Sequence, residues 1–232
     1  KCYIYTHPLA QNSIVYEYKI TNRGNSTWDN VYAGLILDWD IANYANNRVQ
    51  YDPVRQIGIS YATDTSLYCG VRPVLHDTSL STTHYGIDNI AGGGNGVDIS
   101  NSDFTDAEKY QVLSTNRGFA GTGTNSGNDV LDVNSIGPVN LAPGEHFYAS
   151  FIITVEQSLQ TLQTESDTVK KLYEEIVLSL NDPINKEENN LQLNPNPATD
   201  LLEVALNIGD KAIADINVYD LNGRLVLSRP SI

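Results

Sequence analysis

Two stretches of this chain alternate regularly between apolar and other residues, and this alternation constrains the fold more than any other sequence feature. From Ile14 to Thr21, apolar or aromatic residues occupy every second position, with Glu17, Lys19 and Thr21 between them. From Phe147 to Val155, an apolar residue again occupies every second position. Successive side chains of a β-strand point to opposite faces, so a period of two predicts strands. The chain is therefore expected to be mainly β.

Turn-forming residues divide the rest of the chain into short apolar segments. Clusters of Asn, Gly, Ser and Pro occur at residues 22–26, 92–96, 121–128 and 141–145. Several short strands between such turns predict an antiparallel two-sheet sandwich. Val31 to Trp39 reads as a second, more deeply buried strand, and we expect it to pair antiparallel with the strand at Ile14 to Thr21.

One segment follows a helical period instead. Between Ser158 and Val177 the apolar residues recur at steps of three and four, and Lys170 and Lys171 precede acidic residues by four positions. This pattern predicts an amphipathic helix stabilised by ion pairs between successive turns. We expect it to pack on the sandwich; the alternative is a helix that binds a partner.

The charge balance excludes some classes of function. The chain has 14 basic and 28 acidic residues, a net charge of −14, with no cluster of Lys and Arg. A nucleic-acid groove needs such a cluster, so we expect no nucleic-acid partner. No apolar run approaches the roughly 18 residues of a transmembrane segment. Because the chain lacks Met and starts at Lys1 without a signal peptide, we expect it to be a piece of a longer protein.

Motifs for catalysis are missing from the sequence. The four histidines show no HExxH spacing, and no GxSxG elbow is present. Cys2 and Cys69 lie far apart; they either form one disulfide or remain separate thiols. We therefore expect no catalytic residues in this chain.

The best candidate for a binding site is the acidic segment that ends the second predicted strand. Asp38 and Asp40 are two positions apart, so in a strand their charges lie on the same face. A hard cation would offset their repulsion, and Ca²⁺ prefers oxygen ligands such as those of Asn43 and Asp52 in the following loop. Calcium is thus the candidate cofactor. The alternative is that these carboxylates cap turns or accept backbone hydrogen bonds.

The end of the chain differs from the rest. Residues 179–191 are polar and read as a linker between a sandwich at 1–178 and a separate tail at 192–232. In the tail, Val204 and Leu206 lie on an alternating strand. Asn222 and Gly223 form a favoured two-residue hairpin turn, so we expect a hairpin between Ile216–Tyr219 and Leu225–Leu227. The tail is expected to be a small, incomplete antiparallel β unit.

The tail resembles the type A C-terminal sorting domain of the Bacteroidetes type IX secretion system. That family has an Asn-Pro-Ala-x-Asp opening and a Tyr-Asp-x-x-Gly-Arg hairpin. Here the pattern falls on Asn196, Pro197, Ala198, Asp200, Tyr219, Asp220, Asn222, Gly223 and Arg224. Because the family continues through further strands, we expect the tail to be truncated at Ile232. The resemblance implies an extracellular or outer-membrane surface protein, whose partner is the type IX machinery at the outer membrane.

The larger region, from about residue 10 to 177, resembles β-sandwich regions found after subtilisin-like protease domains in secreted Bacteroidetes proteins. The resemblance lies in the segments Tyr18 to Gly24 and Ala33 to Ile41, in the turns at Gly137-Pro138 and Pro143 to Glu145, and in the closing helix. It implies an accessory module whose partners are the upstream domains of the same polypeptide.

Taken together, we expect a noncatalytic structural or adhesive domain of a larger secreted protein, such as a protease, with a C-terminal sorting signal. The alternative is a calcium-dependent carbohydrate-binding module whose partners are surface glycans.

Overall fold

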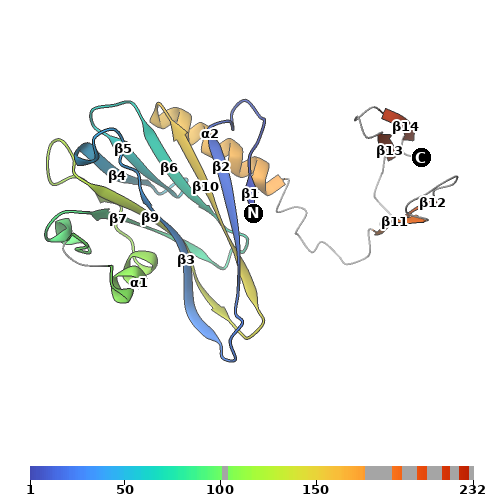
Figure 1. Ribbon diagram of the computed structural model, residues 1–232, viewed down its shortest axis with the longest axis horizontal. Coiled ribbons are helices and arrows are strands. Elements are labelled where there is room, and N and C mark those ends of the chain that lie inside the picture. The colour runs from blue at the N-terminus through green and yellow to red at the C-terminus, as the bar shows by residue number, and fades with distance from the viewer. Residues whose placement is uncertain (101–103, 176–189, 195–202, 208–215, 220–224, 230–232) are drawn as a thin grey trace. The chain divides into compact units, whose positions relative to one another are not determined.

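The computed structural model describes residues 1–100, 104–175, 190–194, 203–207, 216–219 and 225–229. The chain divides into two compact units, Lys1–Leu180 and Asn181–Ile232. The first unit contains two β-sheets of unequal size and two α-helices (Figure 1). The prediction of a mainly β sandwich is confirmed.

The larger sheet has seven strands, and every pair of neighbouring strands in it is antiparallel. In spatial order the strands are β1 (Cys2–Tyr3), β2 (Ser13–Thr21), β10 (His146–Glu156), β6 (Tyr68–Val74), β5 (Ile57–Ala62), β4 (Asn47–Asp52) and β8 (Phe119–Ala120). The strands predicted at Ile14 to Thr21 and Phe147 to Val155 are therefore direct neighbours, β2 and β10.

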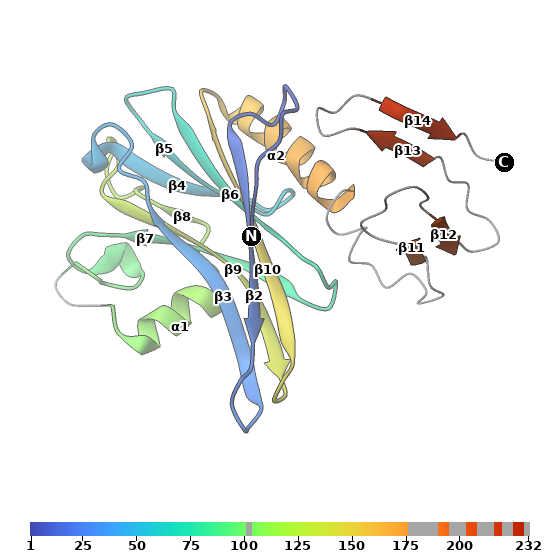
Figure 2. The same ribbon diagram turned by 45° about the vertical axis from the view of Figure 1, so that its right-hand side comes forward.

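The smaller sheet has three strands in the order β3 (Trp28–Asp38), β9 (Val130–Leu141) and β7 (Ser81–Asp88). It covers only part of the larger sheet (Figure 2). The hydrophobic core lies between the two sheets, where Phe147, Ala149 and Phe151 of β10 meet Ile136 of β9. This is the face that the alternation in β10 predicts.

The predicted C-terminal helix is confirmed as α2 (Leu159–Tyr173), which begins after the N-cap Ser158. It packs against the outer face of the larger sheet, where Val169 and Tyr173 contact Val15 and Ile152. The face of β2 that carries Val15 and Glu17 is consequently buried.

A second helix, α1 (Asp106–Ser114), was not predicted. It packs on the outer face of the smaller sheet, where Val112 joins Tyr85 and Val133 in a cluster of buried side chains. Thr105 and Glu108 form a capping box at its start. Two single-turn 3-10 helices, η1 (Tyr44–Asn46) and η2 (Gly93–Asn95), complete the secondary structure of this unit.

Two expectations about the first strands are wrong. β3 does not pair with β2 but with β9 in the other sheet, because the turn at residues 22–27 carries the chain from one sheet to the other. β3 is also not deeply buried, since it lies at an edge of the smaller sheet and none of its residues is fully buried.

Glu17 alternates with the apolar and aromatic residues of β2, yet its side chain is not exposed to solvent. Its exposed fraction is 3% because α2 covers that face. The hydroxyl of Tyr173 donates a hydrogen bond of 2.7 Å to the Glu17 carboxylate, and the Lys1 ammonium lies 2.8 Å from it. Period alone cannot reveal which face a later helix will cover.

In the second unit the structure describes four strands, which form two antiparallel pairs. β11 (Asn190–Asn194) pairs with β12 (Glu203–Asn207), and β13 (Ile216–Tyr219) pairs with β14 (Leu225–Arg229). The predicted pairing of the last two strands is confirmed. Tyr219 ends β13, whereas Asn196, Pro197, Ala198, Asp200, Asp220, Asn222, Gly223 and Arg224 lie outside the described residues.

The two cysteines are separate free thiols and do not form a disulfide. Cys2 is exposed and Cys69 is buried. Burial raises the pKa of the Cys69 thiol to about 12. Among the described helices, none has the length and apolarity needed to cross a membrane.

Candidate functional site

Three carboxylates lie together at one end of the smaller sheet. Asp38 is the last residue of β3, Asp40 follows two positions later, and Asp129 directly precedes β9. Their ligand oxygens all lie within 4.8 Å of one another. Within the part of the chain that the structure describes, no Lys, Arg or His forms an ion pair with any of them. We call these three residues the acidic cluster.

The environment of the acidic cluster makes its negative charge unfavourable. Partial burial raises the pKa of Asp38, and the neighbouring Asp40 and Asp129 raise it further. Partial burial also raises the pKa of Asp129, and Asp40 adds to this, while a 2.8 Å hydrogen bond from the Asn89 side chain opposes it. A bound cation would relieve this repulsion.

The sequence predicted that Asp38 and Asp40 would be close, but the geometry differs from the prediction. β3 ends at Asp38, and Asp40 has a left-handed φ of 41°, as Ala42 does with 53°. A bend, rather than the pleat of a continuous strand, therefore brings the two carboxylates together. Asp129 reaches them because β3 pairs with β9, with Asp38 opposite Leu131. No local sequence signal could have shown this long-range pairing.

The structure places the other two predicted ligands elsewhere. The Asn43 side chain caps η1 by accepting a 3.2 Å hydrogen bond from the backbone N–H of Ala45. The Asp52 carboxylate ends β4 and accepts hydrogen bonds from Arg55 and Gln163. Burial raises the pKa of Asp52, but the hydrogen bonds from Arg55 and its neighbours outweigh this and hold it below the ordinary value. Neither residue belongs to the acidic cluster.

A fourth carboxylate at the same end of the smaller sheet is neutralised internally. Asp88 ends β7 and is buried, and its Oδ2 lies 2.6 Å from Nη2 of Arg117. Its Oδ1 accepts hydrogen bonds from the backbone N–H of Gly121 and from the side chain of Asn128, at 2.7 and 2.8 Å. This arrangement is a complete ion-pair network that needs no external ligand.

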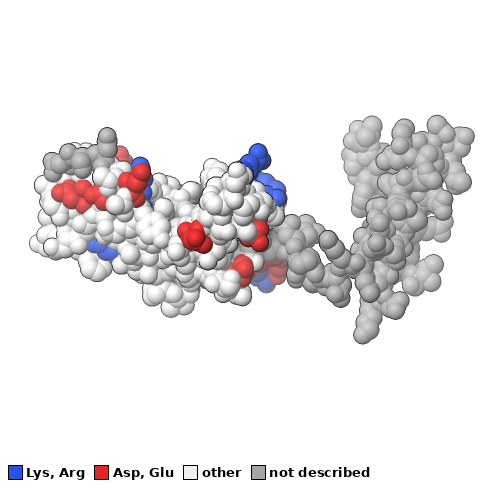
Figure 3. Space-filling model, turned by 90° about the horizontal axis from the view of Figure 1, so that it is seen from below, with Lys and Arg blue, Asp and Glu red and all other residues white. Residues whose placement is uncertain are grey.

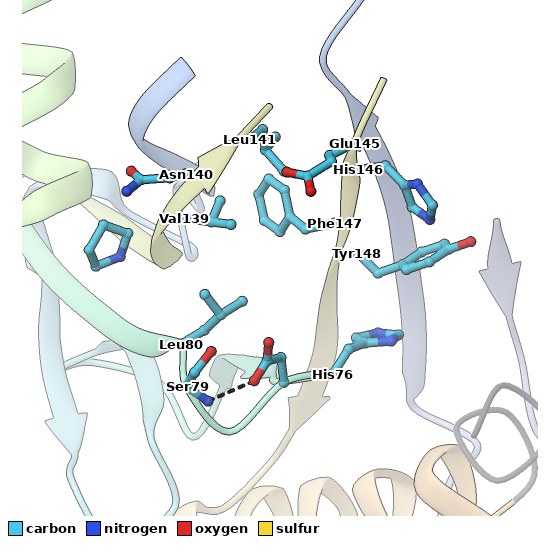
Figure 4. A pocket seen from close by; sticks show the side chains of 12 residues that line it. His76, Ser79, Leu80, Val139, Asn140, Leu141, Glu145, His146, Phe147 and Tyr148 are labelled. Atoms are coloured by element: carbon cyan, nitrogen blue, oxygen red, sulfur yellow. Dashed lines mark hydrogen bonds between the residues drawn. The ribbon is translucent and has the colours of Figure 1, made fainter. Parts of the chain in front are cut away.

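A cavity of about 630 Å³ opens elsewhere in the first unit, between the loop after β6 and the turn that joins β9 to β10. Leu80, Val139 and Phe147 line its interior (Figure 4), and the carboxylate of Glu145 accepts a 2.8 Å hydrogen bond from the backbone N–H of Ala142 in the turn that joins β9 to β10. His76, His146 and Tyr148 project to the other side of β10 in the same view. The cavity has an apolar floor with polar groups at its rim, a lining that small-molecule sites share.

Behind this cavity a hydrogen-bonded serine and histidine resemble part of a hydrolase site. Nε2 of His76 lies 2.7 Å from the Ser150 hydroxyl, which lies 2.8 Å from the Tyr173 hydroxyl. Ser150, however, is completely buried, and the Tyr173 hydroxyl donates its hydrogen bond to the carboxylate of Glu17. This network links α2 to the larger sheet; substrate cannot reach its hydroxyl.

A buried histidine, His84, lies between the two sheets. Nε2 of His84 is 2.9 Å from Oδ1 of Asp132, which also accepts a hydrogen bond from Asn134. All three side chains are at most 1% exposed, and the ring of Tyr51 stacks on that of His84 at 4.8 Å. Nδ1 of His84 and Oδ2 of Asp132 are buried and have no hydrogen-bond partner among the described residues, so the pair is sealed between the sheets.

Charged side chains are sparse on the face of the first unit shown in Figure 3, where acidic side chains form a few separate groups. The excess of 28 acidic over 14 basic residues is therefore not concentrated into one continuous surface on that face.

Comparison with protein families identifies the tail. Residues 192–231 match the family model described as the secretion system C-terminal sorting domain. The match spans the described strands β12, β13 and β14 and most of β11. The chain is therefore a secreted protein that is routed through the type IX secretion system to the cell surface or the extracellular space. Among curated proteins, none matches the chain.

Proposed function

We propose that residues 1–178 form a noncatalytic accessory region of a larger secreted protein, whose upstream part is a hydrolase such as a subtilisin-like protease. The sorting tail carries this proposal, because it marks the chain as the C-terminal part of exported cargo. The sandwich adds the compact, acidic body expected of a domain that accompanies a catalytic domain outside the cell.

The chemistry of the described residues supports an accessory role. The Ser150 and His76 pair is used to hold α2, the His84 and Asp132 pair is sealed between the sheets, and Asp88 is neutralised by Arg117. Each of these groups has its partner inside the sandwich. A catalytic acid or base must instead lie within hydrogen-bond reach of a substrate.

The accessory role predicts what deletion does to the native protein. Removing residues 1–178 from the full-length protein should leave kcat of the upstream hydrolase within about twofold, because no group in contact with the substrate is lost. Stability or surface retention of the hydrolase should fall. Turnover of peptide or glycoside substrates by the purified 232-residue chain would contradict the proposal.

The second candidate function is calcium-dependent binding of carbohydrate, and the acidic cluster favours it. Asp38, Asp40 and Asp129 supply oxygen ligands within 4.8 Å of one another, which is the ligand type that calcium prefers. Binding isotherms on immobilised polysaccharides, with calcium and then with EGTA, separate the two candidates. Saturable binding that EGTA abolishes supports the second candidate; binding that is absent in both conditions removes it.

A further inference from the structure

We propose that the free edge of β3 accepts an extended polypeptide segment as an added strand, which carries apolar side chains at alternate positions and a Lys or Arg opposite Asp38. The occupant is a partner polypeptide defined by that pattern. Three observations on the described residues lead to this proposal.

The first observation is the edge itself. Among the described strands, β3 is hydrogen-bonded only to β9, so its other edge offers unpaired backbone N–H and C=O groups. Proteins usually protect such edges with charged residues or Pro. From Ala33 to Leu37 this edge has neither, and Ile36 is 41% exposed. The edge is therefore ready for strand addition.

The second observation is an apolar groove beside that edge. The larger sheet extends past β3 because it has seven strands and the smaller sheet has three (Figure 2). A cavity of about 480 Å³ results, lined on the larger sheet by Tyr18, Ile20, Ala149 and Phe151 and on β3 by Ala33 and Leu35. Ala149 and Phe151 are already buried, whereas Tyr18 is 46% exposed, so a fourth strand of the smaller sheet would cover mainly the side chains of β2. Alternate side chains of an added strand would fill this groove.

The third observation is the charge at one end of the edge. Asp38 ends β3 as a member of the acidic cluster, which has no ion-pair partner among the described residues. A residue directly opposite Asp38 on an added strand would have its Cβ about 5 Å away. A Lys or Arg at that position would complement the cluster, whereas Asp or Glu would add to its repulsion. This charge complementarity defines the register of the added strand.

A second copy of this chain fits the edge less well. β3 carries Asp29 and Asp38 near its two ends and has no Lys or Arg. Full antiparallel pairing of two β3 strands would bring Asp38 of each copy beside Asp29 of the other. The net charge of −14 on each copy adds further repulsion. A basic, apolar segment of another polypeptide is the better match.

The test uses the full chain and synthetic peptides that alternate valine and threonine. Each peptide carries a single lysine, either at its first or at its last position. The matched peptides replace lysine by glutamate or scramble the order. We expect the lysine peptide to slow amide hydrogen exchange at residues 33–37 and to bind about two- to fivefold tighter than the glutamate peptide. Both effects should persist in EGTA. Because EGTA removes calcium, this result would show that the acidic cluster interacts with the lysine of the peptide and not with bound calcium.

Variants of the chain keep the test specific. Ile36→Lys places a charge on the exposed edge and should abolish peptide binding, while Val54→Lys, at a residue 86% exposed in a turn, is the matched control and should bind normally. Asp38→Asn should reduce the preference for lysine over glutamate but keep binding, because Asp40 and Asp129 retain their charges. Equal protection by the scrambled peptide, no protection at residues 33–37, or dimerisation of the chain alone through this edge would overturn the proposal.

Discussion

Two groups of carboxylates at the same end of the smaller sheet are treated in opposite ways. Asp88, at the end of β7, is buried and has Arg117 at 2.6 Å together with two hydrogen-bond donors. Asp38, at the end of β3, shares its site with Asp40 and Asp129 and has no basic partner among the described residues. The protein therefore neutralises one charge internally and leaves the other three to solvent.

The difference follows from burial. An isolated buried charge loses several kcal/mol of hydration, so a fold that buries Asp88 must also supply its cation. The acidic cluster is exposed or half-buried, so water screens enough of its repulsion for the fold to tolerate it. A carboxylate cluster that the fold tolerates but does not neutralise is available to a cation or a basic partner from outside.

The largest expected effect is the loss of the internal cation. Arg117→Met should lower the free energy of unfolding by about 3–5 kcal/mol, because it leaves Asp88 buried and unpaired. Urea denaturation measures this change. Arg55→Met is the matched control, since its ion pairs with Asp52 and Asp167 are more exposed and their loss should cost about 1 kcal/mol or less. If both substitutions lower the free energy of unfolding by the same amount, burial does not explain why some carboxylates of this protein have a basic partner.

A smaller effect is expected when calcium is supplied to the acidic cluster. At a calcium concentration of tenfold the Kd, binding should add about 1.4 kcal/mol to the stability, which raises Tm by roughly 3–5 °C for a domain of this size. Thermal unfolding with calcium and with EGTA measures the shift, and Asp38→Asn should reduce it. An identical Tm in both conditions excludes calcium from the cluster.

A smaller change still should result from removing one charge of the cluster. Asp38→Asn should raise the free energy of unfolding by a few tenths to about 1 kcal/mol, because it removes repulsion from Asp40 and Asp129. Asp29→Asn, an exposed position on the same strand, is the control and should change little. A clear loss of stability on Asp38→Asn would mean that the carboxylate is a structural acceptor, like Asp88.

The pH dependence should have opposite signs at partnered and unpartnered carboxylates. The pKa values of Asp38 and Asp129 are raised. Their contribution to the free energy of unfolding is therefore most favourable below the ordinary pKa of 3.8, and it is lost as the pH rises through their raised pKa values. The pKa of Asp52 is lowered, so its contribution is present above 3.8 and is lost as the pH falls through its lowered value.

Urea denaturation over a series of pH values tests these signs. Asp129→Asn should reduce the loss of stability above pH 3.8, while Asp52→Asn should reduce the loss at lower pH. If the two variants change the pH profile in the same direction, the distinction between the two kinds of carboxylate is wrong.

The sequence predicted the local features of the fold better than its long-range ones. Strand β10, helix α2 and the pairing of β13 with β14 follow from periodicity or from a turn of Asn and Gly. The partner of β3 does not, because alternation shows that a segment is a strand but not which sheet it joins. α1 was missed although Thr105 and Glu108 carry the spacing of a capping box.

The candidate site divides in the same way. Asp38 and Asp40 could be predicted because they are close in sequence, whereas Asp129 joins them only through the pairing of β3 with β9. Asp52 was an attractive ligand in sequence, but it lies at the far end of β4, where Arg55 neutralises it. The local sequence shows which carboxylates are near one another along the chain, but it does not show which of them form an ion pair with an arginine.

Export of a reporter protein tests the central claim, which is that the C-terminal unit is a sorting signal sufficient for type IX secretion. The complete native tail, starting at residue 181, is fused to a reporter that carries an ordinary signal peptide. In a cell with a working type IX system the reporter should reach the surface or the medium, and in a cell without that system it should remain in the periplasm. Retention in the periplasm of the competent cell would contradict the account.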